Sequence, residues 1–397
     1  MLQTLAAGMW AVAVVWEVIR LGGGPASLSV VATAGAIGII LPALLGGVVA
    51  DRVPQKVILV IVTSVELLGM AVVAALALAG GTSVPVLAGV GFLIGMAMAF
   101  YYPAYTAWLP ALVDESELLA VNGFEGMVRP ALHQALGPAI AGGIIAAVNP
   151  ALAMGVCALV SLAGVLMLLT VPRTPVRRDL PARDEGGPGL AGAWRDLREG
   201  FAFMVRTPWL LATLLFATLL VLSIMGPIEV LVPFLLKERL AGGPQDHAWV
   251  LAAYGLGSAL GSLVMGSLRM PRRYLTVMNL LWGAGALPLI AMGLATSLWQ
   301  VILSAAVLGV AFGMGTVIWG TLLQRRVPSE LLGRVSSLDF FVSLALMPVS
   351  MALAGPLAHW IGITPTFVLA GVLPVIAAVL AVVLAKLPED ELAHPLR

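Results

Sequence analysis

The sequence predicts an all-helical membrane protein with twelve transmembrane helices in two pseudo-symmetric six-helix halves. Of its 397 residues, 60% are hydrophobic and 10% are charged, whereas soluble domains have about 45–50% apolar and about 25% charged residues. The apolar runs are continuous and rich in Ala, Leu and Gly, while the strands of a membrane barrel would alternate apolar and polar residues. Since each helical span needs about 20 apolar residues, the chain is long enough for about a dozen spans.

Charged residues, glycines and prolines divide the apolar runs into individual spans. The first run lacks a basic leader and a small-residue cleavage site, so we expect a retained first helix and not a signal peptide. Cys157 is the single cysteine and can form no disulfide within the chain. The expected helices cover residues 2–21, 26–50, 55–79, 84–108, 121–147, 150–171, 209–236, 248–268, 274–294, 298–322, 335–360 and 364–386.

Basic residues gather on one side of the expected helices. Twelve spans place both termini on the same side, and that side holds seventeen of the 21 Lys and Arg residues. The other side holds Arg20, Lys237 and Arg239, while Arg129 falls inside a helix. Because cytoplasmic loops carry the excess of Lys and Arg, we expect both termini in the cytoplasm.

The longest polar segment, residues 172–208, separates an N-terminal half (1–171) from a C-terminal half (209–397). The second part of the segment reads LAGAWRDLREGFAFMVR, in which Trp194, Leu197, Phe201 and Met204 recur at helical spacing. This pattern predicts an amphipathic helix that lies along the cytoplasmic interface and belongs to a tether between the halves.

An internal repeat relates the two halves. WLPALVDESELLAVNG follows the fourth helix and LLQRRVPSELLGRVSS follows the tenth, so that Glu117 corresponds to Glu330. Similarly, the second helix ends in GGVVADRVPQK and the eighth ends in GSLVMGSLRMPRR. Repeats of this kind predict a substrate site near the middle of the membrane, between the halves.

The stretch GGVVADRVPQK carries a family resemblance. Gly47-Val48-Val49-Ala50-Asp51-Arg52, followed by Lys56, resembles the loop motif Gly-x-x-x-Asp-Arg-x-Gly-Arg-Arg/Lys of the major facilitator superfamily. Pro54 and Gln55 stand where the family usually has Gly and Arg. The resemblance covers essentially the whole chain and implies the twelve-helix fold of that superfamily.

The same resemblance implies that Gly47, Asp51, Arg52 and Lys56 form a cytoplasmic gating motif that favours the outward-open state. Asp51 would accept hydrogen bonds from a helix N-terminus across the interface between the halves. Arg334 and Asp339, at the start of the eleventh helix, are the expected latch partners. The alternative is an ordinary loop that obeys the positive-inside rule.

A second match lies in the fifth helix, where Gly137-Pro138-Ala139-Ile140-Ala141-Gly142-Gly143 resembles the Gly-Pro-rich motif of the superfamily's exporters. Pro138 removes a backbone hydrogen bond and the glycines leave a smooth surface, which suits a bend or a sliding seam.

Three further stretches resemble the bacterial group that includes the enterobactin exporter and macrolide efflux proteins: MWAVAVVWEVIRLGGGPASLSVV, NGFEGMVRPALHQALGP and VPSELLGRVSSLDF. The resemblance implies a bacterial inner-membrane location. Relatives in that group have longer N-termini, often with Gly-Asp where this chain has Ala7-Gly8. The resemblance therefore implies either a shortened first helix or the absence of this acid, and it implies no coupling role at that position.

Acidic residues inside the expected spans are candidates for proton or substrate coupling, because a charge at mid-membrane costs about 2.5–3.5 kcal/mol on insertion scales. Glu17 lies in the first helix, and Glu229 lies in the seventh, directly after Gly226-Pro227. The resemblance implies that both helices line the cavity. The competing interpretation places Glu17 and Glu229 near the outer surface as structural groups. Glu66, in the third helix, ranks behind them because third helices of this fold are mostly peripheral.

Other polar residues form two further candidate groups. Glu125 and Arg129 are four residues apart on the fifth helix and predict either a structural ion pair or a gating or substrate contact. His133 lies one turn beyond Arg129. It is either a group that titrates or, as is more common, an interior histidine whose hydrogen bonds are satisfied. Tyr101, Tyr102 and Tyr105 occupy the cytoplasmic end of the fourth helix, where they predict interface anchors or cavity aromatics that stack on a flat amphipathic substrate.

The chain contains no Gly-Lys-Ser/Thr motif for ATP, no His/Cys pattern with metal-ligand spacing and no Gly-x-Ser-x-Gly motif. We therefore expect a monomeric secondary transporter without cofactor, metal or nucleic-acid partner, which exports a hydrophobic or amphipathic small molecule in exchange for protons. One alternative keeps the fold but moves lysophospholipid or another lipid between leaflets. Another alternative is a non-transporting receptor or an embedded enzyme.

Overall fold

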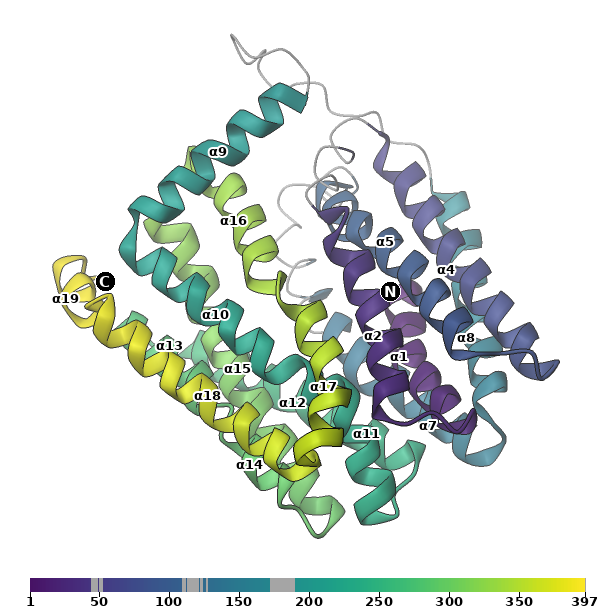
Figure 1. Cartoon of the computed structure of the whole chain (residues 1–397). Coiled ribbons are helices and arrows are strands. Elements are labelled where there is room, and N and C mark those ends of the chain that lie inside the picture. Colours follow the sequence, from purple (N-terminus) through teal and green to yellow (C-terminus); the bar gives the residue numbers. More distant parts are fainter. Residues whose placement is uncertain are drawn as a thin grey trace.

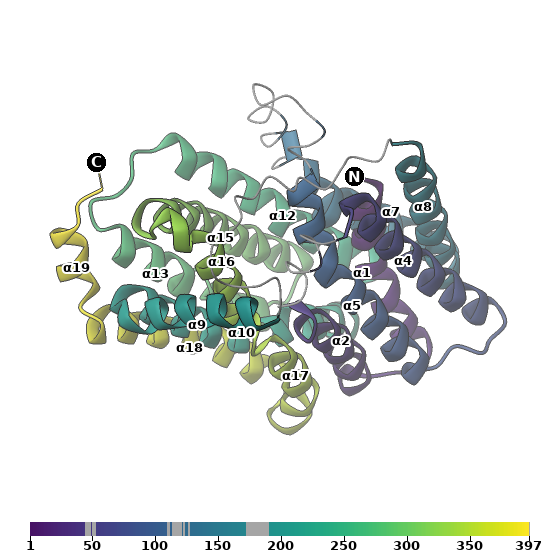
Figure 2. The same cartoon turned by 90° about the horizontal axis from the view of Figure 1, so that it is seen from above.

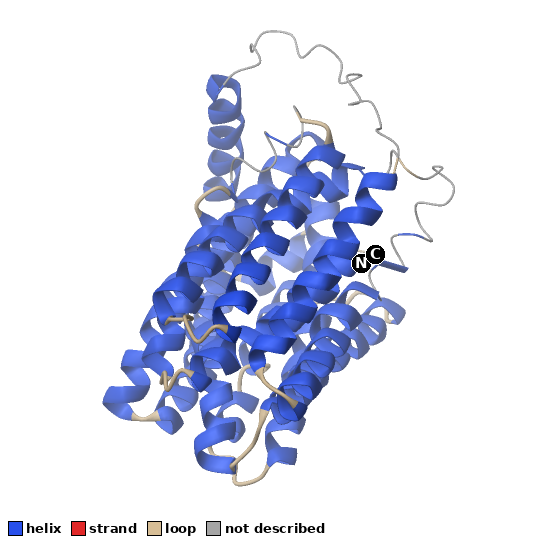
Figure 3. Ribbon diagram, turned by 90° about the vertical axis from the view of Figure 1, so that its right-hand side faces the viewer, coloured by secondary structure: helices blue, strands red, loops and turns tan. Residues whose placement is uncertain are grey.

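The computed structural model describes residues 1–43, 49, 53–108, 112, 121, 124–125, 128–171 and 190–396, with the side chains of all of these except residues 107, 190–197, 329–330, 333 and 337. Within these ranges the chain is helical, with no strand (Figure 3). Ten helices of the described chain are long and apolar enough to cross a membrane. The all-helical prediction is therefore confirmed.

The described helices before the linker form an N-terminal group, drawn from purple to blue in Figure 1. They are α1 (Leu2–Arg20), α2 (Pro25–Ile40), α4 (Gln55–Leu78), α5 (Val84–Trp108), the π-helix η2 (Ala131–Leu136), α7 (Gly137–Ala147) and α8 (Pro150–Thr170). The helix α2 is shorter than the expected range 26–50, and residues 44–48 and 50 lie outside the described part.

The helices from residue 190 onward form a C-terminal group, drawn from teal to yellow in Figure 1. They are α9 (Leu190–Arg206), α10 (Pro208–Gly226), η3 (Pro227–Leu231), α11 (Val232–Phe234), η4 (Leu235–Arg239), α12 (Pro244–Ser267), α13 (Tyr274–Ala284), α14 (Pro288–Gly293), α15 (Leu298–Arg326), α16 (Ser329–Leu344), α17 (Met347–Ile361), α18 (Ile363–Leu384) and α19 (Leu387–Ala393). Figure 2 shows the two groups side by side.

Prolines set many of the helix boundaries. Pro25, Pro150, Pro208 and Pro244 each occupy the first helical position, where the missing N–H removes no helical hydrogen bond. Inside the seventh span, Pro227 begins a π-helix, so the apolar run Pro208–Arg239 is divided into four segments. Rare π-helical turns inside membrane helices often coincide with functional positions.

Glycines allow equivalent helix pairs in the two groups to pack closely. A Cβ atom on Gly38 of α2 would lie 2.3 Å from the carbonyl oxygen of Phe92 on α5. In the C-terminal group, a Cβ on Gly313 of α15 would lie 2.1 Å from the carbonyl oxygen of Ser258 on α12. Since lipid gives helices no hydrophobic reason to associate, such backbone contacts supply much of the packing energy.

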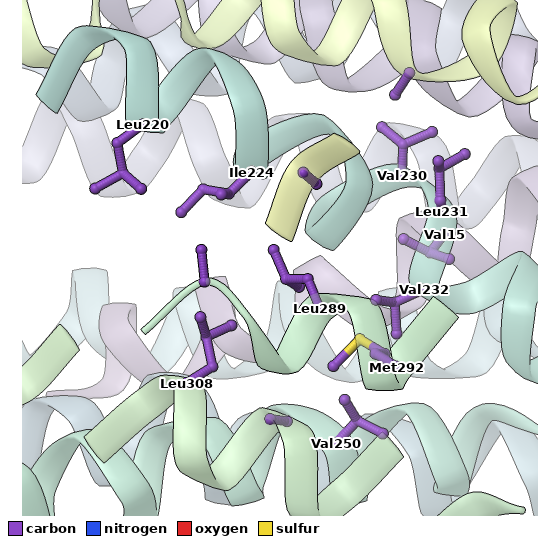
Figure 4. Close-up of a cluster of buried hydrophobic side chains, with 14 of the residues drawn as sticks. Val15, Leu220, Ile224, Val230, Leu231, Val232, Val250, Leu289, Met292 and Leu308 are labelled. Carbon is purple, nitrogen blue, oxygen red and sulfur yellow. The ribbon is translucent and has the colours of Figure 1, made fainter. Parts of the chain in front are cut away.

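A large apolar cluster joins the broken seventh span to its neighbours. Figure 4 shows Leu231 and Val232 from η3 and α11 beside Val15 of α1, with Met292 of α14 below them and Leu289 of the same helix to their left. All five side chains are buried in one core cluster. The cluster therefore includes residues of both groups, because Val15 belongs to the N-terminal group.

The helix α9, in the predicted linker, packs against α10 and α16. Met204 is buried, whereas Phe201 is 52% exposed. Trp194 and Leu197 fall among the residues whose side chains are not described. The predicted helix is therefore present, and Met204 turns toward the C-terminal group.

Candidate functional site

Among the described residues, the main contacts between the two groups join α2 to α17 and α7 to α12. They lie toward the helix ends farthest from the linker, which we call the far side. The amide of Gly355 on α17 donates a 2.9 Å hydrogen bond to Ser29 Oγ on α2. Among the described residues, α17 packs on α2, while α16, which continues α17 toward the linker, packs on α9, α10 and α15. The groups are thus joined on the far side in this conformation.

The Gly-Pro stretch of the fifth span lies at this joint. A Cβ on Gly142 would lie 2.9 Å from the carbonyl oxygen of Pro244 on α12, across the boundary between the groups. A Cβ on Gly137 would lie 2.8 Å from the carbonyl oxygen of Leu5 on α1, within the N-terminal group. Pro138 is buried directly after the π-helix η2. The stretch therefore forms close contacts with two neighbouring helices.

Glu66 is buried in the middle of α4 and has only part of its hydrogen-bonding capacity used. Its Oε1 accepts a 2.9 Å hydrogen bond from Gln3 Nε2 on α1. The same Gln3 nitrogen lies 3.0 Å from Met98 Sδ on α5. Glu66 Oε2 is buried and has no hydrogen-bond partner among the described residues. A carboxyl group held in this way has one oxygen available to a proton.

The tyrosines of α5 and the Glu125–Arg129 pair form one cluster, which we call the Tyr–Arg cluster. The guanidinium carbon of Arg129 lies 5.1 Å from the ring centroid of Tyr102 and 5.0 Å from that of Tyr105. Tyr101 and Tyr105 stack with centroids 5.8 Å apart and planes 4° apart. Arg129 Nη2 lies 3.9 Å from Glu125 Oε2. The cluster consists of Tyr101, Tyr102, Tyr105, Glu125 and Arg129.

The Tyr–Arg cluster and Glu66 form one electrostatic neighbourhood. Tyr101 lies close enough to Arg129, Glu66 and Glu125 for their charges to act on it, and Thr4 of α1 lies near its hydroxyl. Three separate predictions from the sequence, the acid of the third helix, the aromatic run and the ion pair, therefore meet in the N-terminal group. Gln3 and Thr4 belong to the same site, although nothing in the sequence singled them out.

Glu229 occupies a different position. It is exposed within the π-helix η3, although Pro227 and Val230 of the same π-helix are buried. Its charge acts on Tyr254 of α12, and η3 also packs against α2 of the N-terminal group. The accessible carboxylate of Glu229 therefore lies close to the boundary between the groups.

Glu17 already has a partner in its own helix. Its completely buried carboxylate receives bonds of 2.8 Å from Arg20 Nε and 2.6 Å from Arg20 Nη2, in the last turn of α1. This two-pronged arrangement fixes the far end of α1. The geometry favours the structural interpretation of Glu17 over a role in coupling.

The residues of the expected gate are only partly described. Gly47, Asp51 and Arg52 lie outside the described residues. Lys56 donates a 3.0 Å hydrogen bond to the carbonyl of Leu169 and a second bond to the carbonyl of Val171. The ammonium group thus interacts with the negative end of α8 rather than with a carboxylate in this conformation.

The structure describes one contact of Arg334 and two of Asp339, the expected latch partners, with residues of the C-terminal group. Arg334 pairs with Glu199 of the linker helix α9. Asp339 accepts a 2.9 Å hydrogen bond from Trp319 Nε1 and a 3.0 Å hydrogen bond from Ser343 Oγ.

His133 is exposed in η2, near Arg129. In the described part of the chain, no three His, Cys, Asp or Glu side chains come together as a metal site would require.

Comparison with known proteins places the chain among transporters. The sequence pattern of the family described as "Transmembrane secretion effector" matches residues 2–395. The multidrug efflux pump Tap of Mycolicibacterium fortuitum is 26% identical over 97% of this chain and 94% of its own length. Macrolide efflux protein A of Streptococcus pyogenes is 24% identical over 72% of this chain and 70% of its own length.

Solved structures share the fold at low sequence identity. A point mutant of the nucleoside transporter NupG superimposes with a TM-score of 0.72 at 16% identity, over 98% of this chain and 97% of the NupG chain. A POT family transporter in complex with 5-aminolevulinic acid gives a TM-score of 0.74 at 13% identity, over 97% of this chain and 94% of that chain. These similarities concern the fold alone.

Proposed function

This chain belongs to the transmembrane secretion effector family of the major facilitator superfamily, and from this premise we propose that it is a proton-coupled efflux transporter of hydrophobic or amphipathic small molecules. The observation that carries the proposal is the joint on the far side, where α17 packs on α2, while among the described residues the main contacts of α16 are with α9, α10 and α15. A transporter that works by alternating access has such a joint on one side at a time.

The proposed architecture has twelve spans in two six-helix halves, residues 1–171 and 209–397, joined by the linker 172–208. The ten long apolar helices support it, together with the shorter apolar helix Pro25–Ile40 and the helical residues 128–147. The linker, both termini and most basic residues then lie in the cytoplasm of a bacterial cell. A joint on the far side keeps the outer end of the pathway closed, so substrate enters from the cytoplasm or the inner leaflet.

The proposed substrate class rests on the relatives and on one exposed aromatic side chain. The multidrug and macrolide efflux pumps among the relatives support export of drug-like compounds. The exposed ring of Tyr102, at 58% exposure, offers an aromatic surface for an amphipathic molecule. No catalytic chemistry is required, because the family and its relatives are transporters, and we propose that the protein acts as a monomer.

We assign proton transfer to Glu66 and Glu229 and a structural role to Glu17. Glu66 has an unpartnered oxygen and Glu229 is exposed near the boundary between the groups, whereas Glu17 is neutralised by Arg20. The gate comprises Gly47, Asp51, Arg52 and Lys56, which interact with the start of the eleventh span, including Arg334 and Asp339, when the cytoplasmic side closes.

The proposal is tested with purified protein in liposomes that contain a trapped pH dye and carry an imposed proton gradient. The panel of compounds includes macrolides, lipophilic cations, siderophores and lysolipids. We expect proton movement that depends on a drug-like compound. Compound movement without any proton movement would overturn proton coupling, and translocation of lysolipid alone would identify the protein as a lipid transporter.

A further inference from the structure

The Tyr–Arg cluster has the composition of a binding site for a cation, and a side chain of the protein already fills it. The guanidinium of Arg129 lies over the rings of Tyr102 and Tyr105 at 5.1 Å and 5.0 Å, with Glu125 at 3.9 Å. Cations within about 6 Å of an aromatic centroid are attracted by the negative face of the ring, and aromatic cages recognise quaternary ammonium groups in this way.

We propose that Tyr102, Tyr105 and Glu125 form the site for the cationic group of an amphipathic substrate, and that Arg129 is a tethered occupant which this substrate displaces. The inference deepens the proposed efflux function and rests on it. It assigns the site to monovalent lipophilic cations and gives Arg129 the role of an internal competitor.

The contacts of Arg129 allow it to leave. Its distance of 3.9 Å from Glu125 is at the outer limit for an ion pair, and its side chain is 28% exposed. By contrast, the Arg20–Glu17 pair has two contacts of 2.8 Å and 2.6 Å. Arg129 is therefore held mainly by the tyrosine faces, which another cation can use equally well.

The position of the cluster gives a substrate access to it. The π-helix η2 begins two residues after Arg129 and packs against α1 of its own group and α12 of the other group. Tyr102 is 58% exposed. The cluster therefore lies beside the boundary between the groups, where the substrate of an alternating-access transporter has to pass.

The charge balance of the site favours a cation over an anion. Arg129 is the single Lys or Arg residue in the interior of the expected spans, away from their ends, and the charges of Glu66 and Glu125, in addition to that of Arg129, act on Tyr101. When Arg129 swings away, two carboxyl groups and the tyrosine faces remain. A monovalent cation restores the charge that the guanidinium supplied, whereas an anion would bind to Arg129 itself.

A tethered competitor lowers the apparent affinity by the fraction of time for which the site is open. If Arg129 fills the site for about nine-tenths of the time, its removal strengthens binding about tenfold. The prediction is unusual, because removal of a side chain that merely supports the fold would weaken binding or leave it unchanged.

The test measures equilibrium binding of radiolabelled tetraphenylphosphonium to the purified full-length protein. We expect Arg129→Gln to bind this cation several-fold more tightly than the wild type. Tyr105→Leu should bind it several-fold more weakly, whereas Tyr105→Phe, which keeps the ring, should bind it as the wild type does. The matched control is Arg20→Gln, which removes an arginine from the other intrahelical Arg–Glu pair and should leave binding unchanged.

Weaker or absent tetraphenylphosphonium binding in Arg129→Gln, or an equal gain in Arg20→Gln, would overturn the cation site. Transport of the uncharged drug chloramphenicol, measured on the same preparations, shows whether each variant is folded and separates the two proposals. Retained chloramphenicol transport with no effect of Arg129→Gln on cation binding would refute the cation site while the efflux function stands. If the wild type transports none of the compounds, the efflux function itself is refuted.

Discussion

In each of the two helix groups, two helices meet at a buried polar contact, and the two contacts differ in one respect. In the N-terminal group, Gln3 of α1 donates to the carboxyl of Glu66 on α4 at 2.9 Å. In the C-terminal group, Asn279 of α13 approaches Thr213 of α10, with Nδ2 3.5 Å from Oγ1. The spacing between Glu66 and Asn279 in the chain equals that between Glu117 and Glu330, the pair that revealed the repeat.

The difference between these contacts is chemical rather than architectural. Each contact leaves one buried oxygen without a partner among the described residues, Glu66 Oε2 and Asn279 Oδ1. A carboxyl group can bind and release a proton, whereas an amide cannot change its charge. The N-terminal group therefore has a residue that can titrate where the C-terminal group has a neutral amide, and this asymmetry supports Glu66 as one of the two proposed proton carriers.

The largest expected effect comes from Glu66→Gln, which makes the N-terminal contact resemble the C-terminal one. Because the amide cannot carry a proton, we expect uphill efflux to fall more than tenfold while downhill exchange of substrate continues. Paired measurements in liposomes, with and without a proton gradient, separate the two activities. Asn279→Ala is the matched control and should keep coupled transport; an equal loss in both variants would remove the asymmetry.

Removal of the Glu17 carboxylate should affect stability rather than coupling. Glu17→Gln loses two charge-assisted bonds to Arg20, and such bonds contribute about 1.5–3 kcal/mol each to stability. We expect a lower melting temperature in detergent and an unchanged ratio of protons to substrate in the protein that remains folded. A normal melting temperature combined with lost coupling would exchange the roles of Glu17 and Glu66.

Bulky substitutions at the two close glycine contacts, between α2 and α5 and between α12 and α15, should destabilise both helix groups to a similar extent. Gly38→Leu and Gly313→Leu place side chains against the carbonyls of Phe92 and Ser258, and overpacking of this kind costs about 1–3 kcal/mol. Thermal unfolding should show the loss. Gly89→Leu and Gly320→Leu, where a Cβ meets nothing within 4 Å, serve as controls. An equal loss of stability in these controls would mean that the two close glycine contacts have no special role.

The smallest expected effect concerns the ion pair that ties the linker helix to the eleventh span. Glu199 is 48% exposed and Arg334 is 22% exposed, and exposed pairs contribute about 0–1 kcal/mol. Glu199→Gln should therefore change the transport rate less than about fivefold. A much larger change in the rate would show that α9 controls the gate.

The sequence predicted the helical fold well because a membrane span is a local property of about 20 consecutive residues. The expected range 84–108 coincides with Val84–Trp108, and 274–294 is close to the span Tyr274–Gly293. The division of the eleventh span between Leu344 and Met347 was not predicted. Such breaks depend on tertiary contacts, which periodicity does not reveal.

The site could be predicted only in parts. Glu66, the tyrosines and the Glu125–Arg129 pair were each recognisable as unusual residues in a membrane helix, but their proximity depends on how α1, α4 and α5 pack. Gln3, which is 63 residues away from Glu66, carries no signal of its own. The gate, the cytoplasmic orientation and the coupling roles remain predictions, and Asp51 lies outside the described residues.

Alternating access is tested most directly by electron-spin distances on both sides of one protein, with Cys157→Ala as the background. One labelled pair, at Leu78 of α4 and Trp360 of α17, lies on the far side, and a second, at Leu169 of α8 and Leu384 of α18, lies on the linker side; all four residues are exposed. We expect Glu66→Gln or added substrate to lengthen one distance while the other shortens. Distances that stay fixed, or that change in the same direction on both sides, would contradict the proposed mechanism.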